Sequence, residues 1–105
     1  MEKLQTIREQ AAVENLLVSA HAAGEMVEDA FSLDDVIEAL TSHEARFLED
    51  YPEHRRGPCC LVLGWTHTAR PMHVVCTTGR STPIIITVYE PKPPKWVTPA
   101  QRGLR

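Results

Sequence analysis

The sequence predicts an α+β domain in which N-terminal helices pack on one face of a four-stranded antiparallel sheet. Three observations lead to this fold. Apolar residues recur with a helical period up to about residue 43 and with a strand-like alternation from residue 44 onward. The acidic residues cluster on the helical half, as solvated helix faces require. The later apolar segments are joined by short polar connections, which only antiparallel neighbours allow.

Three helices are predicted in the first part of the chain. The first spans residues 3–13, where apolar side chains fall on one face. A short apolar patch at 16–18 is expected to form a brief strand or an extended segment. The second helix covers residues 20–30. The third starts at Ser32, a suitable N-cap because two aspartates follow in the first turn, where the helix dipole favours anions.

Four strands follow, and their residue ranges are 45–51, 60–66, 72–77 and 84–89. Beyond them, residues 91–105 hold four prolines, four basic residues and Trp96. This composition predicts an extended segment anchored by Trp96. We therefore expect a single domain over residues 1–98 and a loose tail over residues 99–105.

Size and composition are those of one globular domain: 105 residues, 43% hydrophobic and 24% charged. No apolar run approaches the roughly 20 residues of a membrane-spanning helix, and the charged N-terminus does not resemble a signal peptide. The three cysteines, an odd number, are expected to be free thiols in a reducing cytoplasm. A cytoplasmic protein with no membrane contact is therefore expected.

Charge is distributed very unevenly along the chain. The first 53 residues hold three basic and thirteen acidic residues, a net −10, whereas the remaining 52 hold eight basic and one acidic, a net +7. A basic second half is a candidate surface for an anionic partner such as nucleic acid. The alternative is that the two halves neutralise each other in the fold.

Strand alternation predicts which face of the sheet is buried. If register follows parity, one apolar face lies under the helices and consists of Met72, Val74, Cys76, Ile84, Ile86 and Val88. The opposite, exposed face carries His73, with Thr87 nearly opposite it and Tyr89 within diagonal reach at about 6–8 Å. Arg70 and Arg80 are expected to flank this pair, which is the best candidate site in the chain.

The candidate residues suit proton transfer and phosphate binding. The His73 imidazole titrates near neutral pH and can act as a general acid or base, although it can equally be an ordinary exposed strand histidine. Tyr89 can donate to a phosphate or stack on a base, or only pack at the sheet end. Arg70 and Arg80 can bind phosphate through their planar forks, or remain solvated.

Two further residues have weaker claims on a site. His21, at the start of the second helix, can face a bound anion or make a structural hydrogen bond. Glu90 is expected to pair with a nearby arginine. No CxxC or HxxxH spacing frames a metal site, and no phosphate-binding glycine loop or GxSxG motif is present, so we expect neither metal nor cofactor.

An ordered set of motifs resembles a small bacterial family, domain-of-unknown-function family 4258. The motifs are SAHAAGEM (19–26), SLDDVIEAL (32–40), YP (51–52), GPCCLVLG (57–64), RPMHVV (70–75), IIITVYEP (84–91) and Trp96. The resemblance extends over about residues 5–98. Family members are similar to RelE-like and MqsR-like toxins, and they often occur beside a small YgiT-type zinc-finger protein that resembles an antitoxin.

The resemblance implies a metal-independent ribonuclease in which the RNA 2′-hydroxyl attacks its own phosphate. The family's recurrent polar positions fall on His21, Arg70, His73, Tyr89 and Glu90. They imply catalytic roles for His73, His21 and Tyr89, and substrate contacts for Arg70 and Glu90. Arg80, which the predicted strand ends place beside them, is expected to contact the substrate as well. The partners would be RNA and a small zinc-finger protein. The alternative is a non-catalytic protein-interaction module with the same fold.

One departure from the family pattern bears on activity. Glu25 precedes Met26 where the family usually has arginine. A carboxylate in place of a cation weakens any anion site nearby, unless Glu25 only lies on the solvated helix face.

Overall fold

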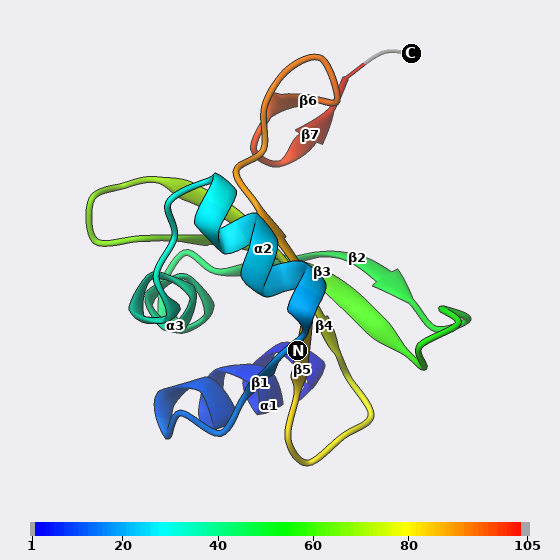
Figure 1. Ribbon diagram of the computed structural model, residues 1–105. Helices are drawn as coiled ribbons and strands as arrows, with labels where there is room; N and C mark the ends of the chain where they lie inside the picture. The colour runs from blue at the N-terminus through cyan, green and yellow to red at the C-terminus, as the bar shows by residue number, and fades with distance from the viewer. Residues whose placement is uncertain (1, 104–105) are drawn as a thin grey trace.

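The computed structural model describes residues 2–103, which form three helices and seven strands (Figure 1). The helices are α1 (Glu2–Ala12), α2 (Ala20–Glu28) and α3 (Leu33–Thr41). The strands are β1 (Leu17–Val18), β2 (Arg46–Tyr51), β3 (Cys59–Trp65), β4 (Pro71–Thr77), β5 (Ile84–Tyr89), β6 (Trp96–Thr98) and β7 (Gln101–Arg102). None of the helices in this part of the chain combines the length and apolar content that a membrane-spanning helix requires.

Serine caps define where the second and third helices begin. The Ser19 hydroxyl accepts a hydrogen bond from the Ala22 N–H at 3.1 Å. Ser32 and Asp35 form a reciprocal capping box, in which each side chain accepts from the other residue's backbone N–H. Such a box satisfies two N–H groups that have no partner within the helix. The predicted N-cap at Ser32 is confirmed.

The main sheet is mixed and five-stranded, with the order β1-β5-β4-β3-β2. β2, β3, β4 and β5 pair antiparallel in succession, but β1 adds to the edge of β5 in parallel, with Leu17 beside Ile84. The α+β class is therefore confirmed, and the purely antiparallel four-stranded sheet is wrong. A two-residue strand has too few positions to show alternation, so the sequence did not distinguish sheet pairing from an extended segment.

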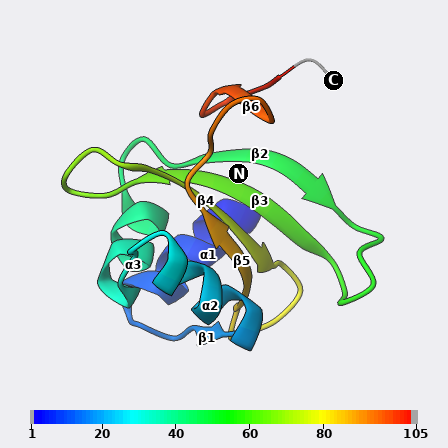
Figure 2. The same ribbon diagram turned by 45° about the horizontal axis from the view of Figure 1, so that its top comes forward.

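All three helices lie on one side of the sheet and form the core with it (Figure 2). The core is made of apolar side chains from both layers, among them Ile7, Val36, Leu40, Val62, Met72, Val74 and Val88. Burying each such side chain stabilises the fold by roughly 1.5–3 kcal/mol. α3 approaches β3 so closely that a Cβ on Gly64 would lie 2.0 Å from the Ala39 carbonyl oxygen. Glycine is therefore required at this contact.

A β-bulge changes the predicted faces of β5. Val75 pairs with Thr87, but the next residue, Cys76, pairs with Ile85 rather than Ile86. The extra residue reverses the alternation beyond it. Ile85 therefore joins the core under the helices, whereas Ile84 and Ile86 line a cavity with Thr77 and Arg80. The predicted placement of Ile84 and Ile86 in the helix-facing core is wrong for this reason.

The segment after β5 folds back onto the sheet face opposite the helices (Figure 2). We call residues 91–103 the C-terminal arm; it contains the hairpin β6–β7. Trp96 is 3% exposed, so its predicted role as an anchor is confirmed. Residues 101–102, within the segment expected to be a loose tail, form β7 and pair with β6; residues 104–105 lie outside the described part of the chain.

Candidate functional site

His73 and Tyr89 lie directly opposite each other on β4 and β5. The His73 Nδ1 atom is 3.0 Å from the Tyr89 hydroxyl oxygen, and the two ring centroids are 5.1 Å apart. The predicted proximity of the pair is confirmed, and they are closer than expected. The predicted register is wrong by two residues, because Thr87 lies opposite Val75 and not opposite His73.

The His73 ring is completely buried, which corrects the prediction of an exposed sheet face. The C-terminal arm covers it: the Trp96 ring stands edge-on at 4.4 Å, and the Pro99 carbonyl oxygen lies 2.6 Å from the His73 Nε2 atom. The strand parity was right, since His73 points away from the helices. Nothing in the local sequence showed that a distant segment returns to cover this face.

The hydrogen bonds fix the tautomer of His73. A carbonyl oxygen only accepts, so Nε2 must carry the proton and donate it to Pro99. In the neutral ring Nδ1 is then an acceptor, and it receives the Tyr89 hydroxyl proton. Burial lowers the pKa of His73, an effect that the Pro99 carbonyl partly offsets. At neutral pH the ring is therefore an uncharged base with both nitrogens occupied.

Glu49, Tyr51 and Arg102 form an ionic cluster beside this pair. The Arg102 guanidinium binds both Glu49 carboxylate oxygens, at 2.7 and 2.8 Å, and the Tyr51 hydroxyl donates to the same carboxylate. The hydrogen bond from Arg102 lowers the pKa of Glu49. Burial, together with the neighbouring carboxylate, raises the pKa of Tyr51. A single anion is thus held between a cation and a phenol.

The sequence patterns did not predict this cluster. Glu49 belongs to the acidic half of the chain and Arg102 to the tail, 53 residues away. The only available signal was the i, i+2 spacing of Glu49 and Tyr51, which places both side chains on one strand face.

The Trp96 indole N–H is a buried donor close to the same site. Its Nε1 atom is buried and has no hydrogen-bond acceptor of good geometry among residues 2–103. It lies close enough to the Tyr89 hydroxyl to act on that group: burial raises the pKa of Tyr89, and the indole partly offsets this rise. The hydrogen bond between Tyr89 and His73 is thus covered by the Trp96 ring, whose N–H makes no hydrogen bond among the described residues.

Arg70 and Glu90 lie outside this site and hold the fold together. Arg70 donates to the Glu90 carboxylate at 3.0 Å and to the backbone carbonyls of Asp29 and Ala30. Its guanidinium also stacks on the Phe31 ring at 4.0 Å. The predicted pairing of Glu90 with an arginine is confirmed. In this arrangement Arg70 fastens the loop between α2 and α3 to the sheet and does not face His73.

His21 and Arg80 are also remote from the His73–Tyr89 pair. His21 lies on α2, on the helical side of the sheet, where its exposed ring is 3.4 Å from Glu25. Arg80 follows the far end of β4 and lines a cavity with Arg56, Thr77, Ile84 and Ile86. Of the six candidate residues, only His73 and Tyr89 lie together at this site, and Arg70 and Glu90 pair with each other elsewhere.

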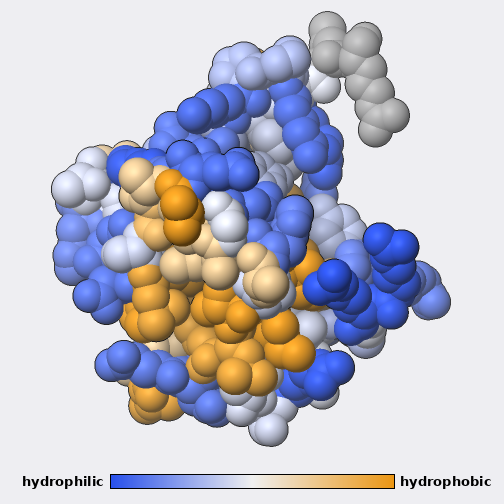
Figure 3. Space-filling model, in the orientation of Figure 1, coloured by the Kyte–Doolittle hydropathy of each residue, from blue (hydrophilic) through white to orange (hydrophobic). Residues whose placement is uncertain are grey.

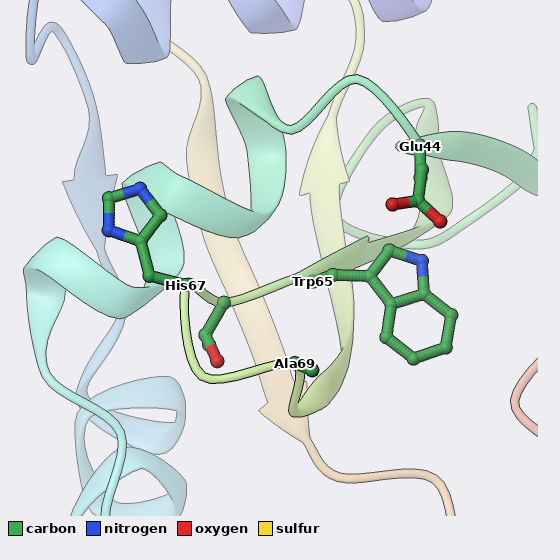
Figure 4. A pocket seen from close by; sticks show the side chains of 5 residues that line it. Glu44, Trp65, His67 and Ala69 are labelled. Atoms are coloured by element: carbon green, nitrogen blue, oxygen red, sulfur yellow. The ribbon is translucent and has the colours of Figure 1, made fainter.

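A larger cavity, of about 390 Å³, lies at the β3–β4 turn and is lined by Glu44, Trp65, Thr66, His67 and Ala69 (Figure 4). Figure 4 shows the His67 ring directed away from Trp65 and Glu44. His67 instead pairs with Glu38 at 3.1 Å. The cavity therefore lacks a facing acid and base. Within residues 2–103, no group of three or more His, Cys, Asp or Glu side chains is placed to hold a metal ion, and the three cysteines are buried free thiols.

Comparison with protein families gives one match. The family model described as "Domain of unknown function (DUF4258)" matches residues 18–90, which is more than half of the chain. The matched region runs from β1 to the end of β5 and includes His73 and Tyr89, whereas α1 and the C-terminal arm lie outside it. Neither the curated proteins nor the solved structures contain a significant match.

Proposed function

We propose that this chain, which belongs to the DUF4258 family, cleaves RNA without a metal ion on the sheet face that carries His73 and Tyr89. The observation that carries the proposal is the direct hydrogen bond between these two side chains. Cleavage by the 2′-hydroxyl needs one group to accept the 2′ proton and another to protonate the 5′-oxygen. A hydrogen-bonded imidazole and phenol supply both.

Access to His73 requires the C-terminal arm to move, because the ring is completely buried under it. Departure of the Pro99 carbonyl also removes the acceptor that keeps the proton on Nε2. The ring can then take its other tautomer, in which Nδ1 donates to the Tyr89 oxygen. This leaves Nε2 as a free base and the Tyr89 hydroxyl as a free donor.

In the proposed reaction the 2′-oxygen bonds to phosphorus while the P–O5′ bond breaks. His73 Nε2 takes the 2′ proton, and Tyr89 donates its proton to the leaving 5′-oxygen. The proton on Nδ1 then passes to the Tyr89 oxygen, so that both side chains end neutral. The products are a 2′,3′-cyclic phosphate and a 5′-hydroxyl.

The family resemblance extends this proposal to a type II toxin of the RelE-like or MqsR-like kind. A small zinc-finger protein would be its antitoxin partner. In that role the chain would act on cellular RNA in the bacterial cytoplasm.

The alternative is a non-catalytic protein-interaction module, and two observations favour it. Both nitrogens of His73 already have partners within the protein. Apolar side chains are also exposed on the helical side, where Val13, Leu17 and Val27 are 71%, 57% and 82% exposed. Figure 3 shows apolar surface gathered around α1 and β1, with a smaller area at the end of α2. Such a surface suits a protein partner.

Incubation of the purified chain with mixed RNA in the presence of a chelator tests the proposal. We expect cleavage with cyclic phosphate ends, reduced about 10²–10⁴-fold by His73→Ala and by Tyr89→Phe. His43→Ala is the matched control, because His43 is an exposed histidine away from the site. Circular dichroism establishes that each variant is folded. Cleavage that survives His73→Ala, or that depends on added metal, would contradict the mechanism.

A further inference from the structure

We infer that the cavity between Arg56 and Arg80 is a binding subsite for one nucleotide unit. It has a volume of about 300 Å³ and is lined by Arg56, Thr77, Arg80, Ile84 and Ile86. These residues come from the turn before β3, the end of β4, the turn between β4 and β5, and β5 itself. The cavity is separate from the His73–Tyr89 pair.

The charge of the cavity is positive and uncompensated. Both arginines are exposed, and neither forms an ion pair with any residue between 2 and 103. In contrast, Arg70 and Arg102 are occupied by Glu90 and Glu49. The sequence has no acidic residue between Glu53 and Glu90, so neither strand β4 nor its flanking turns bring a carboxylate to this cavity. Two planar guanidinium forks from separate turns match the oxygens of a phosphate group.

The floor of the cavity is apolar, which narrows the ligand class. Ile84 and Ile86 reach this face only because the bulge in β5 reverses the alternation. The Thr77 hydroxyl lies beside them and accepts a hydrogen bond from the Ile84 N–H at 2.9 Å. Cations at the rim and aliphatic groups at the floor suit a phosphate that carries a flat ring. A nucleotide has this chemistry, whereas inorganic phosphate uses only the rim.

The position of the cavity connects it to the proposed reaction. Thr77 and His73 lie four residues apart on β4 and point to the same sheet face, about 13 Å apart at the rise of a strand. A single RNA strand lying along this face reaches both. The identity of the ligand as part of an RNA substrate rests on the proposed function, but the binding of a nucleotide by the cavity does not.

Titration of the ¹⁵N-labelled full chain with adenosine monophosphate, followed by NMR, tests the subsite. We expect saturable shifts at the amides of Thr77, Arg80, Ile84 and Ile86. Each of Arg56→Ala and Arg80→Ala should weaken binding about tenfold, since a charge-assisted hydrogen bond contributes about that factor. Ile84→Ala should weaken the binding of adenosine monophosphate but leave the binding of inorganic phosphate, which is weaker from the start, unchanged.

Arg55→Ala is the matched control, because Arg55 is an exposed arginine in the same turn but does not line the cavity. If the cavity is the subsite, Arg55→Ala should weaken the binding of adenosine monophosphate by less than about threefold. Equal weakening by Arg55→Ala and Arg56→Ala, or no saturable binding, would overturn the inference. If His73-dependent RNA cleavage is unchanged in Arg56→Ala and Arg80→Ala, the cavity does not hold part of the RNA substrate, and the ribonuclease proposal stands. If the nucleotide binds but RNA is not cleaved, the nucleotide subsite stands and the ribonuclease proposal fails.

Discussion

Arg102 of β7 holds the Glu49 carboxylate of β2 in a two-pronged ion pair, with N–O distances of 2.7 and 2.8 Å. The same guanidinium lies 4.7 Å from the centre of the Trp96 ring. These contacts tie a short hairpin to the sheet directly over His73. Because a two-stranded hairpin is marginally stable by itself, the closure of the arm depends on this ion pair and on the burial of Trp96.

Arg102→Ala is expected to loosen the arm without unfolding the domain. Both side chains of the ion pair are partly exposed, so its loss should cost about 1 kcal/mol or less. Hydrogen–deuterium exchange of residues 91–103 should become faster, while the core strands keep their protection. If His73 is the catalytic base under the arm, RNA cleavage should also increase.

Lys92→Ala serves as the comparison for this change. Lys92 is an exposed cation of the same arm, and it makes no ion pair within the described part of the chain. If residues 91–103 exchange hydrogen for deuterium at the same rate in Arg102→Ala and in the unmodified chain, the ion pair does not hold the arm closed.

The pH dependence of stability should report the burial of His73. Burial lowers the pKa of His73 below its ordinary value of about 6.5, so in mildly acidic solution the unfolded chain binds a proton that the folded chain does not. The free energy of unfolding should therefore fall as the pH drops below about 6.5, by at most about 1.4 kcal/mol per pH unit. Above pH 7.5, where His73 is neutral in both the folded and the unfolded chain, the free energy of unfolding should no longer change because of this residue.

Urea unfolding between pH 7.5 and 5.5, compared with His73→Gln, isolates this effect. The other four histidines are common to both proteins, and the lowered pKa of Glu49 acts only at more acidic pH. The variant should show a flatter pH profile. Parallel profiles would mean that His73 is accessible to protons in the folded state.

Local patterns explain why much of the fold could be predicted. The Ser32 capping box lies within four residues, and the helical and strand periods of the core elements are properties of single segments. The outward direction of His73 follows from alternation along β4 alone. These features depend on neighbouring residues, which the sequence displays directly.

The features that could not be predicted depend on long-range contacts. The bulge at Val75 and Cys76 is decided by how β4 and β5 pack, and not by either sequence alone. The cover over His73 depends on a proline-rich segment that folds back as a hairpin, with Pro99 reaching a residue 26 positions earlier. Trp96 was recognisable as an anchor, but its place against His73 was not.

We expect Glu25, which stands where the family resemblance led us to expect an arginine, to have a structural role. Its carboxylate accepts a hydrogen bond from the Val88 backbone N–H at 3.0 Å, beyond the point where β1 stops covering the β5 edge. Glu25→Arg removes the acceptor and should destabilise the fold by about 1–3 kcal/mol. Glu25→Gln keeps an acceptor and should cost less. Denaturant unfolding measures both changes, and an arginine variant as stable as the unmodified chain would show that the contact contributes nothing.

The bulge in β5 predicts opposite outcomes for two adjacent isoleucines. Ile85 is fully buried under the helices, so Ile85→Ala should lower the free energy of unfolding by about 2–5 kcal/mol through lost burial and a cavity. Ile84 is only partly buried on the opposite face, so Ile84→Ala should cost less than about 1.5 kcal/mol. Regular alternation would give the reverse order, because it places Ile84 in the core. Urea unfolding of the two variants therefore decides the register, and with it whether an apolar floor lies between Arg56 and Arg80.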